Sequence, residues 1–327
     1  MTETPVLSVR DLIVEIPTRQ AVLRPVDGVS YDIARGEILG VVGESGAGKS
    51  MTGNAVIGLL DRPARVASGE IILNGTRIDN LSPQAICKRR GHEIGMVFQD
   101  PLTSLNPLLT VGEQLAETMR EHLGISDKEA RKRAIAALDE VGIPGASQRI
   151  DSYPHAFSGG MRQRVVIALA LCAEPSLLIA DEPTTALDVS VQAQIIALLR
   201  RLGRDRGMAV MLVTHDMGVI AETADRVAVM YAGRLAELGP VREVLTAPRH
   251  PYTEGLMAAT PLAAATQTRL RQIPGAMPRL GQLPDGCAFH PRCPHVQDDC
   301  RRGATPTLTA CDGRAACWHP VLAERVA

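Results

Sequence analysis

The sequence has few aromatic residues, an almost balanced charge and no long apolar run. Phenylalanine, tryptophan and tyrosine make up 2% of the 327 residues, and the formal net charge is −1. Scarce aromatics do not favour base-stacking surfaces, and a neutral balance gives no support to a general nucleic-acid binder. The longest apolar run, Val165 to Ala173, is too short to cross a bilayer. The first residues lack the basic and apolar regions of a signal peptide, which predicts a cytosolic protein.

Alternating strand and helix patterns predict a parallel α/β core in the first 240 residues or so. Short apolar runs at Glu37–Val42, Ser176–Ala180 and Ala209–Thr214 have the character of buried strands. Further strands are predicted at Leu7–Ile16, Gly28–Ile33, Glu70–Leu73, Ile94–Gln99, Val227–Tyr231 and Arg234–Leu238, and helices at Met51–Leu60, Val111–His122, Asp127–Val141, Ser158–Ala173 and Val189–Arg206. The helices between about residues 100 and 160 predict a helical insertion. After residue 240 proline becomes frequent, and we expect a helical linker followed by a loop-rich tail.

The stretch Gly43–Ser50 has the pattern G-x-x-x-x-G-K-S between a predicted strand and a predicted helix. Backbone N–H groups of such a glycine-rich turn surround phosphates. Lys49 is expected to neutralise charge on the β- and γ-phosphates, and the Ser50 hydroxyl to bind Mg²⁺. The pattern therefore predicts a nucleotide site formed by Gly43, Glu44, Ser45, Gly46, Ala47, Gly48, Lys49 and Ser50.

Polar residues follow two other predicted strands. Asp181 and Glu182 end an apolar strand, where the carboxyl edge of a parallel sheet forms sites. Asp181 is predicted to hold Mg²⁺ and Glu182 to polarise the attacking water, although such a pair alone can also be a helix cap or a solvated turn. His215 can contact the γ-phosphate and orient that water, or it can be structural. Gln99 can reach the ion and the water.

A second phosphate-binding element begins at Ser158, followed by Gly159 and Gly160 at the start of an apolar helix. A helix N-terminus presents backbone N–H groups and the positive end of its dipole, which suits an anion. The chain already has the phosphate loop Gly43–Ser50, about a hundred residues earlier. Two such elements in one chain predict that each serves half of a shared site.

Six motifs, in this order, resemble those of ABC transporter ATPase subunits: Gly43–Ser50, Gln99–Pro101, Ser158–Gln163, Leu178–Glu182, Ala186–Asp188 and Thr214–Asp216. The resemblance covers about residues 5–240. It implies an α/β P-loop NTPase cassette with a RecA-like parallel sheet core, an antiparallel β subdomain and a helical subdomain. It also implies that Gln99 is the Q-loop glutamine, Asp181 the Walker B aspartate, Glu182 the catalytic glutamate, Asp188 the D-loop aspartate and His215 the switch histidine.

The same resemblance implies that two cassettes pair head to tail. ATP then lies between the Walker A loop of one chain, here Gly43–Ser50, and the signature of its partner, here contributed by Ser158, Gly159, Gly160 and Gln163. The sequence departs from the family where an aromatic residue usually stacks on adenine. Residues 17–24 contain no aromatic, so Arg19, Arg24 or Val22 would have to contact the base.

The tail contains most of the seven cysteines: Cys287, Cys293, Cys300, Cys311 and Cys317. In a reducing cytosol such a cluster indicates a metal site rather than disulfides. The run Gly286–His295, with Cys300 and Ala316–His319, resembles the C-terminal extension of dipeptide/oligopeptide importer ATPases. That resemblance implies a [4Fe–4S] cluster on Cys287, Cys293, Cys300 and Cys317, with Cys311 as an extra cysteine. Zinc or free thiols are the alternatives.

These resemblances predict an ATPase subunit that uses ATP and Mg²⁺ to drive uptake of di- or oligopeptides. The expected domains are an ATPase domain at residues 1–240 and a C-terminal extension at residues 241–327. The expected partners are a second cassette, two transmembrane permease subunits and an extracytoplasmic solute-binding protein, with no nucleic acid, at the cytoplasmic face of the inner membrane. The alternatives are import of nickel or another small solute, a soluble ABC ATPase acting on DNA or ribosomes, and a regulatory cassette without hydrolysis.

Overall fold

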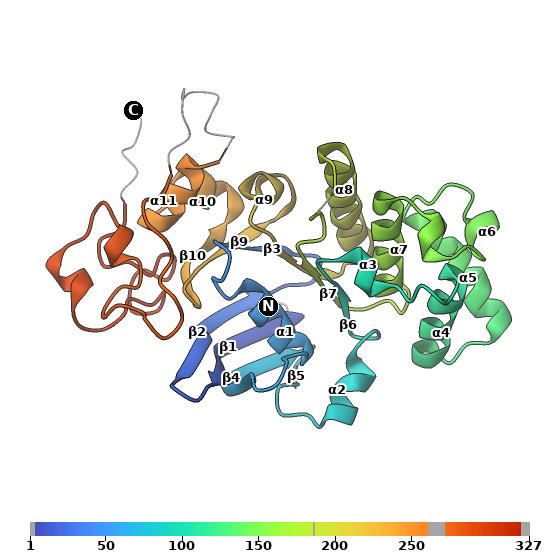
Figure 1. Cartoon of the computed structure of the whole chain (residues 1–327), viewed down its shortest axis with the longest axis horizontal. Coiled ribbons are helices and arrows are strands. Elements are labelled where there is room, and N and C mark those ends of the chain that lie inside the picture. The colour runs from blue at the N-terminus through green and yellow to red at the C-terminus, as the bar shows by residue number, and fades with distance from the viewer. Residues whose placement is uncertain (1–3, 186, 261–271, 322–327) are drawn as a thin grey trace. The chain divides into compact units, whose positions relative to one another are not determined.

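The computed structural model describes residues 4–185, 187–260 and 272–321, apart from the side chains of residues 101 and 102. The chain forms two compact units, each built from several segments. The first unit contains residues 1–6, 34–37 and 80–211, and the second contains residues 7–33, 38–79 and 212–327. Helices and strands carry the labels of Figure 1.

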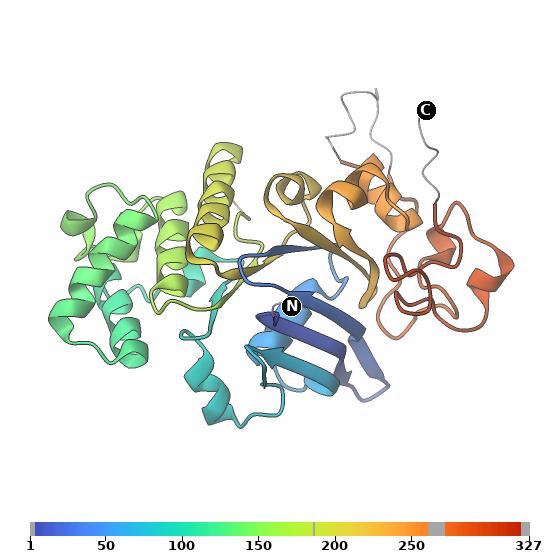
Figure 2. The same ribbon diagram turned by 180° about the vertical axis from the view of Figure 1, so that it is seen from behind.

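The second unit contains an antiparallel sheet of four strands in the order β2-β1-β4-β5. These strands are β2 (Val22–Ile33), β1 (Leu7–Pro17), β4 (Arg65–Leu73) and β5 (Thr76–Arg77). Leu7 lies opposite Ile33 on one side and Leu73 on the other, and all three side chains are fully buried. Figure 2 shows this sheet from behind. The antiparallel β subdomain expected from the resemblance is therefore confirmed.

Three further strands of the second unit lead to the phosphate loop. β3 (Ile38–Val42) runs parallel to β9 (Arg226–Tyr231), which pairs antiparallel with β10 (Arg234–Pro240). All five residues of β3 are buried, as expected for a parallel strand that is covered on both faces. The loop after β3 leads directly into α1 (Lys49–Ile57).

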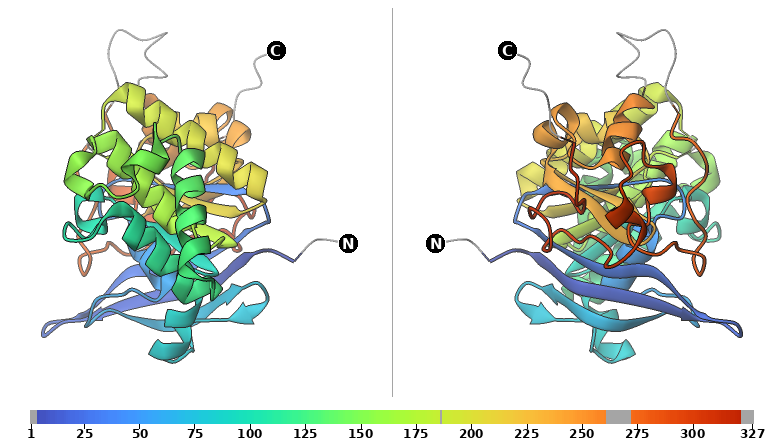
Figure 3. Two further views of the ribbon diagram at one scale, coloured as in Figure 1. Left: turned by 90° about the vertical axis from the view of Figure 1, so that its right-hand side faces the viewer. Right: turned by 90° about the vertical axis from the view of Figure 1, so that its left-hand side faces the viewer.

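The C-terminal extension is joined to β10 by backbone hydrogen bonds. The Leu238 N–H donates to the Arg314 carbonyl at 2.8 Å, and the Ala316 N–H donates to the Ala236 carbonyl at 2.8 Å. The extension contains α10 (Val241–Thr246), α11 (Pro251–Ala258), η3 (His290–Arg292) and η4 (Asp298–Arg301), and its last part has little regular structure (Figure 3, right panel). Residues 241–327 thus belong to the same compact unit as the phosphate loop.

The first unit carries the other part of the parallel core. β6 (Ile94–Val97) runs parallel to β7 (Leu177–Asp181), and the five residues of β7 are all buried. α7 (Gly159–Leu171) and α8 (Val189–Arg206) belong to this unit, as does α2 (Pro83–Arg89). β8 (Ala209–Val213) begins in this unit and continues into the second.

The segment between β6 and α7 is helical, as predicted. It contains α3 (Pro101–Ser104), α4 (Val111–Leu123), α5 (Asp127–Glu140), α6 (Ala146–Arg149) and η1 (Pro154–Ala156), which face the viewer in the left panel of Figure 3. A capping box between Thr110 and Glu113 begins α4. α5 begins at Asp127, as predicted, and the Ser126 hydroxyl caps it by accepting the Glu129 N–H.

Several elements have no counterpart in the sequence prediction. These are α2, β5, α9 (Met217–Thr223), the first half of β2 and the first half of β4. α2 buries only Ile86, so its sequence has no apolar face to reveal a helix. The added part of β4 is mostly exposed, and the added part of β2 buries only Pro25 and Val26; both segments are held by pairing with β1.

A buried carboxylate holds the turn that connects α10 to α11 in the second unit. The Glu237 carboxylate, on a residue 2% exposed, accepts the backbone N–H groups of Arg249 and His250 at 3.0 and 2.9 Å. His250 Nδ1 accepts the Tyr252 N–H at 3.0 Å and so caps α11. Burial lowers the pKa of His250 to about 4, which keeps the imidazole neutral.

Stability is predicted to fall with acid because of His250. Its folded pKa lies below the unfolded value near 6.5, so the stabilisation is complete above pH 6.5 and is lost as the pH falls towards 4. The loss amounts to about 3 kcal/mol. His250→Asn keeps a side-chain acceptor for the α11 cap but does not titrate. Urea unfolding at several pH values is expected to show a shallower acid decline for this variant, and parallel declines would contradict the assignment.

Candidate nucleotide and metal sites

The Gly43–Ser50 loop joins β3 to α1 and passes very close to neighbouring backbone. A Cβ on Gly43 would lie 2.2 Å from the Met230 carbonyl oxygen, and one on Gly48 would lie 2.3 Å from the Pro25 carbonyl oxygen. Gly48 also has a φ of 103°, which L side chains rarely adopt. Only glycine therefore fits at either position, which explains the two outer glycines of the pattern.

The Lys49 ammonium lies inside this loop. Its Nζ donates to the carbonyl oxygens of Gly43 and Glu44 at 2.8 and 3.1 Å, and the residue is 6% exposed. Ser45, Gly46 and Ser50 are exposed at the surface of the loop. The loop thus combines a buried positive charge with accessible backbone, an arrangement suited to a phosphate group.

His215 belongs to the same unit as the loop. It follows Thr214, whose N–H donates to the Val41 carbonyl of β3 at 3.1 Å. The next residue, Asp216, caps α9 by accepting the Gly218 N–H at 2.7 Å. His215 is exposed between these two fixed points. The sequence placed His215 correctly at the end of a strand, and the structure adds that this strand end is bonded to β3.

In the first unit, Gln99 and Glu182 are brought together from different elements. Asp181, 8% exposed, is the last residue of β7, and Glu182 follows it with a φ of 46°. Gln99 Nε2 donates to Glu182 Oε2 at 3.0 Å. The Thr185 hydroxyl donates to the same oxygen at 3.0 Å. The sequence singled out Gln99, Asp181 and Glu182, but it gave no signal for Thr185, whose role depends on the turn after β7.

The Ser158 hydroxyl caps α7 by accepting the Met161 N–H at 3.4 Å, so the helix begins where the sequence predicted. Ser158 and Gly159 are exposed at this helix start. A Cβ on Gly160, in contrast, would lie 2.7 Å from Val191 Cγ1 of α8. The second glycine therefore allows two helices to approach, while a Cβ on the first would make only an ordinary contact, 3.9 Å from Leu187 Cδ2.

Two other residues of the predicted nucleotide set, Asp188 and Gln163, differ in their surroundings. Asp188 caps α8 by accepting the Val191 N–H at 2.9 Å. Gln163 is 1% exposed, and its Nε2 has no hydrogen-bond partner among the described residues. This burial does not favour the predicted contact between Gln163 and a nucleotide on the surface of α7. Ala186, part of the D-loop motif, lies outside the described residues.

Four cysteines of the extension influence one another electrostatically. Burial raises the pKa of the Cys287 and Cys317 thiols to about 11 and about 12, and nearby thiols raise both further. For Cys287 these neighbours are Cys300 and Cys293, and for Cys317 they are Cys287, Cys293 and Cys300. Backbone N–H groups of Phe289 and His290 also reach the Cys287 sulfur, which favours its thiolate form.

Cys311 lies beside this group and differs from it in its surroundings. Burial and Asp312 raise the pKa of its thiol, whereas the backbone N–H of Cys317 lowers it. Among the described residues, the one group of three possible metal ligands within 4.8 Å is Asp299, Cys300 and His319. In a zinc tetrathiolate, with Zn–S bonds of about 2.3 Å, all four sulfurs would lie within about 4.6 Å of one another. The four cysteines are therefore more widely spaced than zinc requires.

Residues predicted as possible base contacts lie at the start of β2. Val22 is 54% exposed, and Arg24 forms an ion pair with Glu15 at 3.1 Å. The guanidinium of Arg24 is therefore already paired with a carboxylate. Its neighbour Leu23 lies against the extension, because a Cβ on Gly281 would be 2.9 Å from Leu23 Cδ2.

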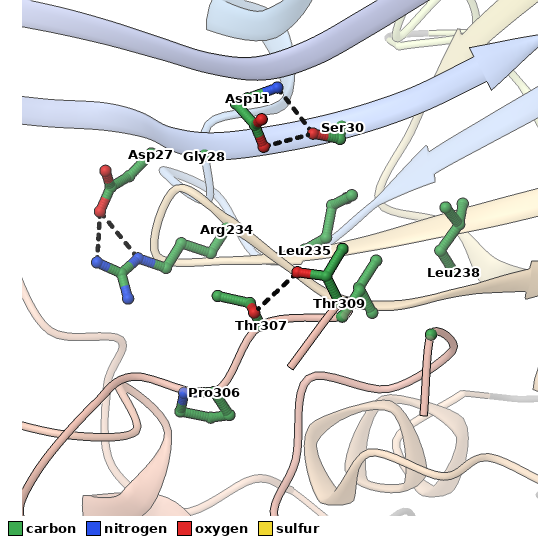
Figure 4. Close-up of a pocket in the computed structure, with 12 residues that line it drawn as sticks. Asp11, Asp27, Gly28, Ser30, Arg234, Leu235, Leu238, Pro306, Thr307 and Thr309 are labelled. Atoms are coloured by element: carbon green, nitrogen blue, oxygen red, sulfur yellow. Dashed lines mark hydrogen bonds and ion pairs between the residues drawn. The ribbon is translucent and has the colours of Figure 1, made fainter. Parts of the chain in front are cut away.

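A pocket of about 410 Å³ opens between β1, β2, β10 and the end of the extension (Figure 4). The Asp27 carboxylate accepts Arg234 Nε at 2.9 Å on one side of it, and Ser30 donates to Asp11 at 3.0 Å on another. Thr307 and Thr309 face these groups from the extension. No residue of the predicted nucleotide or metal sites lines this pocket.

Family comparisons give the class of protein. Residues 26–185 match the family described as ABC transporter, and residues 236–300 match the family described as oligopeptide/dipeptide transporter, C-terminal region. Solved structures agree: a dimeric bacterial ABC transporter cassette, MJ0796, is 29% identical with a TM-score of 0.65, and the match covers 72% of this chain and 99% of that one. No helix among the described residues combines the length and the apolar character needed to span a membrane.

Curated relatives match over nearly the whole length. The dipeptide transport ATP-binding protein DppD of Escherichia coli K12 is 45% identical over 96% of this chain and 97% of the relative. The protein of the same name from Bacillus subtilis is 46% identical over 96% and 94%. The chain therefore belongs to the ATPase subunits of ABC transporters, in the group that has an oligopeptide/dipeptide transporter C-terminal region.

The two signature glycines are predicted to respond differently to alanine. Both replacements gain the helix propensity of alanine. Only Gly160→Ala forces a methyl group against Val191, which costs about 1–3 kcal/mol by overpacking. Denaturant unfolding is expected to find Gly160→Ala less stable than Gly159→Ala by this amount, and equal stabilities would contradict the close approach of the two helices.

Proposed function

We propose that this protein hydrolyses ATP to drive the import of di- or oligopeptides. Two observations support the two halves of this proposal. Hydrolysis is supported by the hydrogen bond between Gln99 and Glu182, which fixes a carboxylate beside a strand end suited to metal binding. Peptide import is supported by relatives that are named for peptide transport and that match the extension as well as the cassette.

In the proposed reaction, the Gly43–Ser50 loop binds the ATP phosphates and Lys49 neutralises their charge. Glu182 accepts a proton from the attacking water, and Gln99 and Thr185 hold its carboxylate in position. His215 contacts the γ-phosphate and orients the water. The general-base role suits Glu182, because Asp181 ends the buried strand and is largely covered.

Mg²⁺ is the metal expected with ATP. The Ser50 hydroxyl, the Asp181 carboxylate and the Gln99 amide oxygen are hard oxygen donors, which is the ligand set that Mg²⁺ prefers. When bound, the ion would neutralise phosphate charge. Because the Gln99 amide nitrogen already donates to Glu182, its oxygen can act as the ligand.

Two cassettes are proposed to pair head to tail. Ser158 and Gly159, exposed at the start of α7, and Gly160 behind them would serve the nucleotide of the partner. Asp188 acts mainly by holding α8 through its cap. The remaining partners are two transmembrane permease subunits and an extracytoplasmic solute-binding protein, with the chain at the cytoplasmic face of the inner membrane.

Glu182→Gln is predicted to stop turnover while ATP still binds. The amide keeps the shape of the side chain but cannot accept the proton of water, so turnover should fall at least about a hundredfold. The measurement is ATPase activity of the transporter in proteoliposomes with a peptide-loaded binding protein. Stimulation by DNA or ribosomes in place of peptide would favour the soluble alternative, and unchanged hydrolysis would contradict the role of Glu182.

We propose separately that Cys287, Cys293, Cys300 and Cys317 hold a [4Fe–4S] cluster. Thiolates are the ligands of such clusters, and one thiolate on each of the four irons allows wider sulfur spacing than zinc does. The influence of the Cys287, Cys293 and Cys300 thiols on the Cys317 thiol supports this choice, whereas Cys311 is affected by the Cys317 backbone and by Asp312. The cluster would supply a structural crosslink to a tail with little regular structure.

Cys300→Ser is predicted to abolish the cluster, with Cys311→Ser as the matched control. Protein purified without oxygen is expected to be brown, with about four irons and four sulfides per chain and absorption near ~400 nm. The Cys311→Ser variant should keep this spectrum. A colourless protein with one zinc would contradict the proposal, as would loss of iron in the Cys311→Ser variant.

A further inference from the structure

Arg292 of the extension is a buried cation that meets the phosphate loop. Its side chain is 6% exposed, and it pairs with the Glu44 carboxylate at 3.0 Å. The guanidinium also lies near the rings of Tyr231 and Phe289, 5.8 and 6.0 Å from their centroids. A charge so deeply buried is stable only with an anionic partner, so Glu44 and Arg292 depend on each other.

Glu44 is the second residue of the phosphate loop, and three of its polar groups are engaged. Its backbone N–H donates to the Tyr252 hydroxyl at 2.8 Å, and Tyr252 is fully buried. Its carbonyl accepts Lys49 Nζ at 3.1 Å. Its carboxylate accepts from Arg292. Two of these three partners come from the sequence beyond residue 240, outside the cassette motifs.

Arg292 also holds a second segment over the loop. Its Nε donates to the Pro274 carbonyl at 2.9 Å. A few residues further on, Met277 reaches the loop, because a Cβ on Gly46 would lie 3.2 Å from Met277 Cε. The guanidinium therefore connects the loop itself with the segment that covers it.

We infer that Arg292 is a positioning residue for ATP: through Glu44 it orders the phosphate loop before the nucleotide binds. This inference rests on the proposed nucleotide site. Gly43, Gly46 and Gly48 all have positive φ values, and glycines lose more conformational freedom on ordering than other residues. When neighbouring residues order the loop in advance, this conformational entropy is not lost on ATP binding. The affinity for ATP is therefore higher.

The test measures equilibrium binding of MgATP to the full-length chain in the Glu182→Gln background, where hydrolysis does not interfere. Arg292→Ala is expected to raise the Kd about tenfold, equal to about 1.4 kcal/mol. Arg314→Ala is the matched control, because Arg314 forms an ion pair within the extension to Glu243, away from the loop. It should leave the Kd unchanged.

Glu44→Gln keeps the test valid if Arg292→Ala perturbs the extension. It removes the ion pair from the loop side and should raise the Kd by a similar factor. The double variant should be no weaker than either single one, because both remove the same interaction. Additive effects, or a Kd for Glu44→Gln within about twofold of the parent, would overturn the inference. Lys49→Ala distinguishes a failure of the inference on Arg292 from a failure of the proposed nucleotide site. If Lys49→Ala leaves the Kd unchanged, the nucleotide site itself is misassigned.

Discussion

The ion pair between the buried Arg292 and the partly exposed Glu44 is the interaction on which the order of the phosphate loop depends. The loop is rich in glycine and has little conformational preference of its own. Tyr252 fixes the Glu44 amide and Arg292 fixes its carboxylate, so the loop is shaped by residues far along the sequence. Since Arg292 directly precedes Cys293, the proposed cluster ligands and the proposed ATP site share one short segment.

A different constraint acts on α7, the helix that begins at the signature residues Ser158, Gly159 and Gly160. Its first turn is exposed, whereas its body packs closely on α8. Ser158 satisfies the helix start with its own hydroxyl, and Gly160 gives Val191 the space it needs. A Cβ on Gly159 would lie 3.9 Å from Leu187 Cδ2, an ordinary contact distance. Packing therefore does not require a glycine at position 159, which is consistent with the proposed contact between this position and the nucleotide of a partner.

Local patterns predicted most of this fold and the strand ends where the candidate site residues lie. The buried strands and the helical insertion were predicted because their apolar periodicity is local. Gln99, Asp181, Glu182 and His215 were proposed as site residues because each lies at or just after the end of a predicted strand and within a motif of the family. Contacts between distant residues could not be predicted. Nothing in the sequence pairs Arg292 with Glu44, or buries Gln163, because both result from packing between segments far apart in the chain. The exposed α2 and the half-strands of β2 and β4 were missed because they lack an apolar pattern.

In the proposed function, one chain carries two half-sites, one for its own ATP and one for the ATP of its partner. These half-sites are separated by measuring MgATP binding by the isolated chain and turnover by the complete transporter, for Lys49→Ala and Gly159→Ala. Lys49→Ala is expected to lose both, whereas Gly159→Ala is expected to keep the binding affinity and lose turnover. If Gly159→Ala weakened ATP binding by the isolated chain as much as Lys49→Ala does, the division into two half-sites would be wrong.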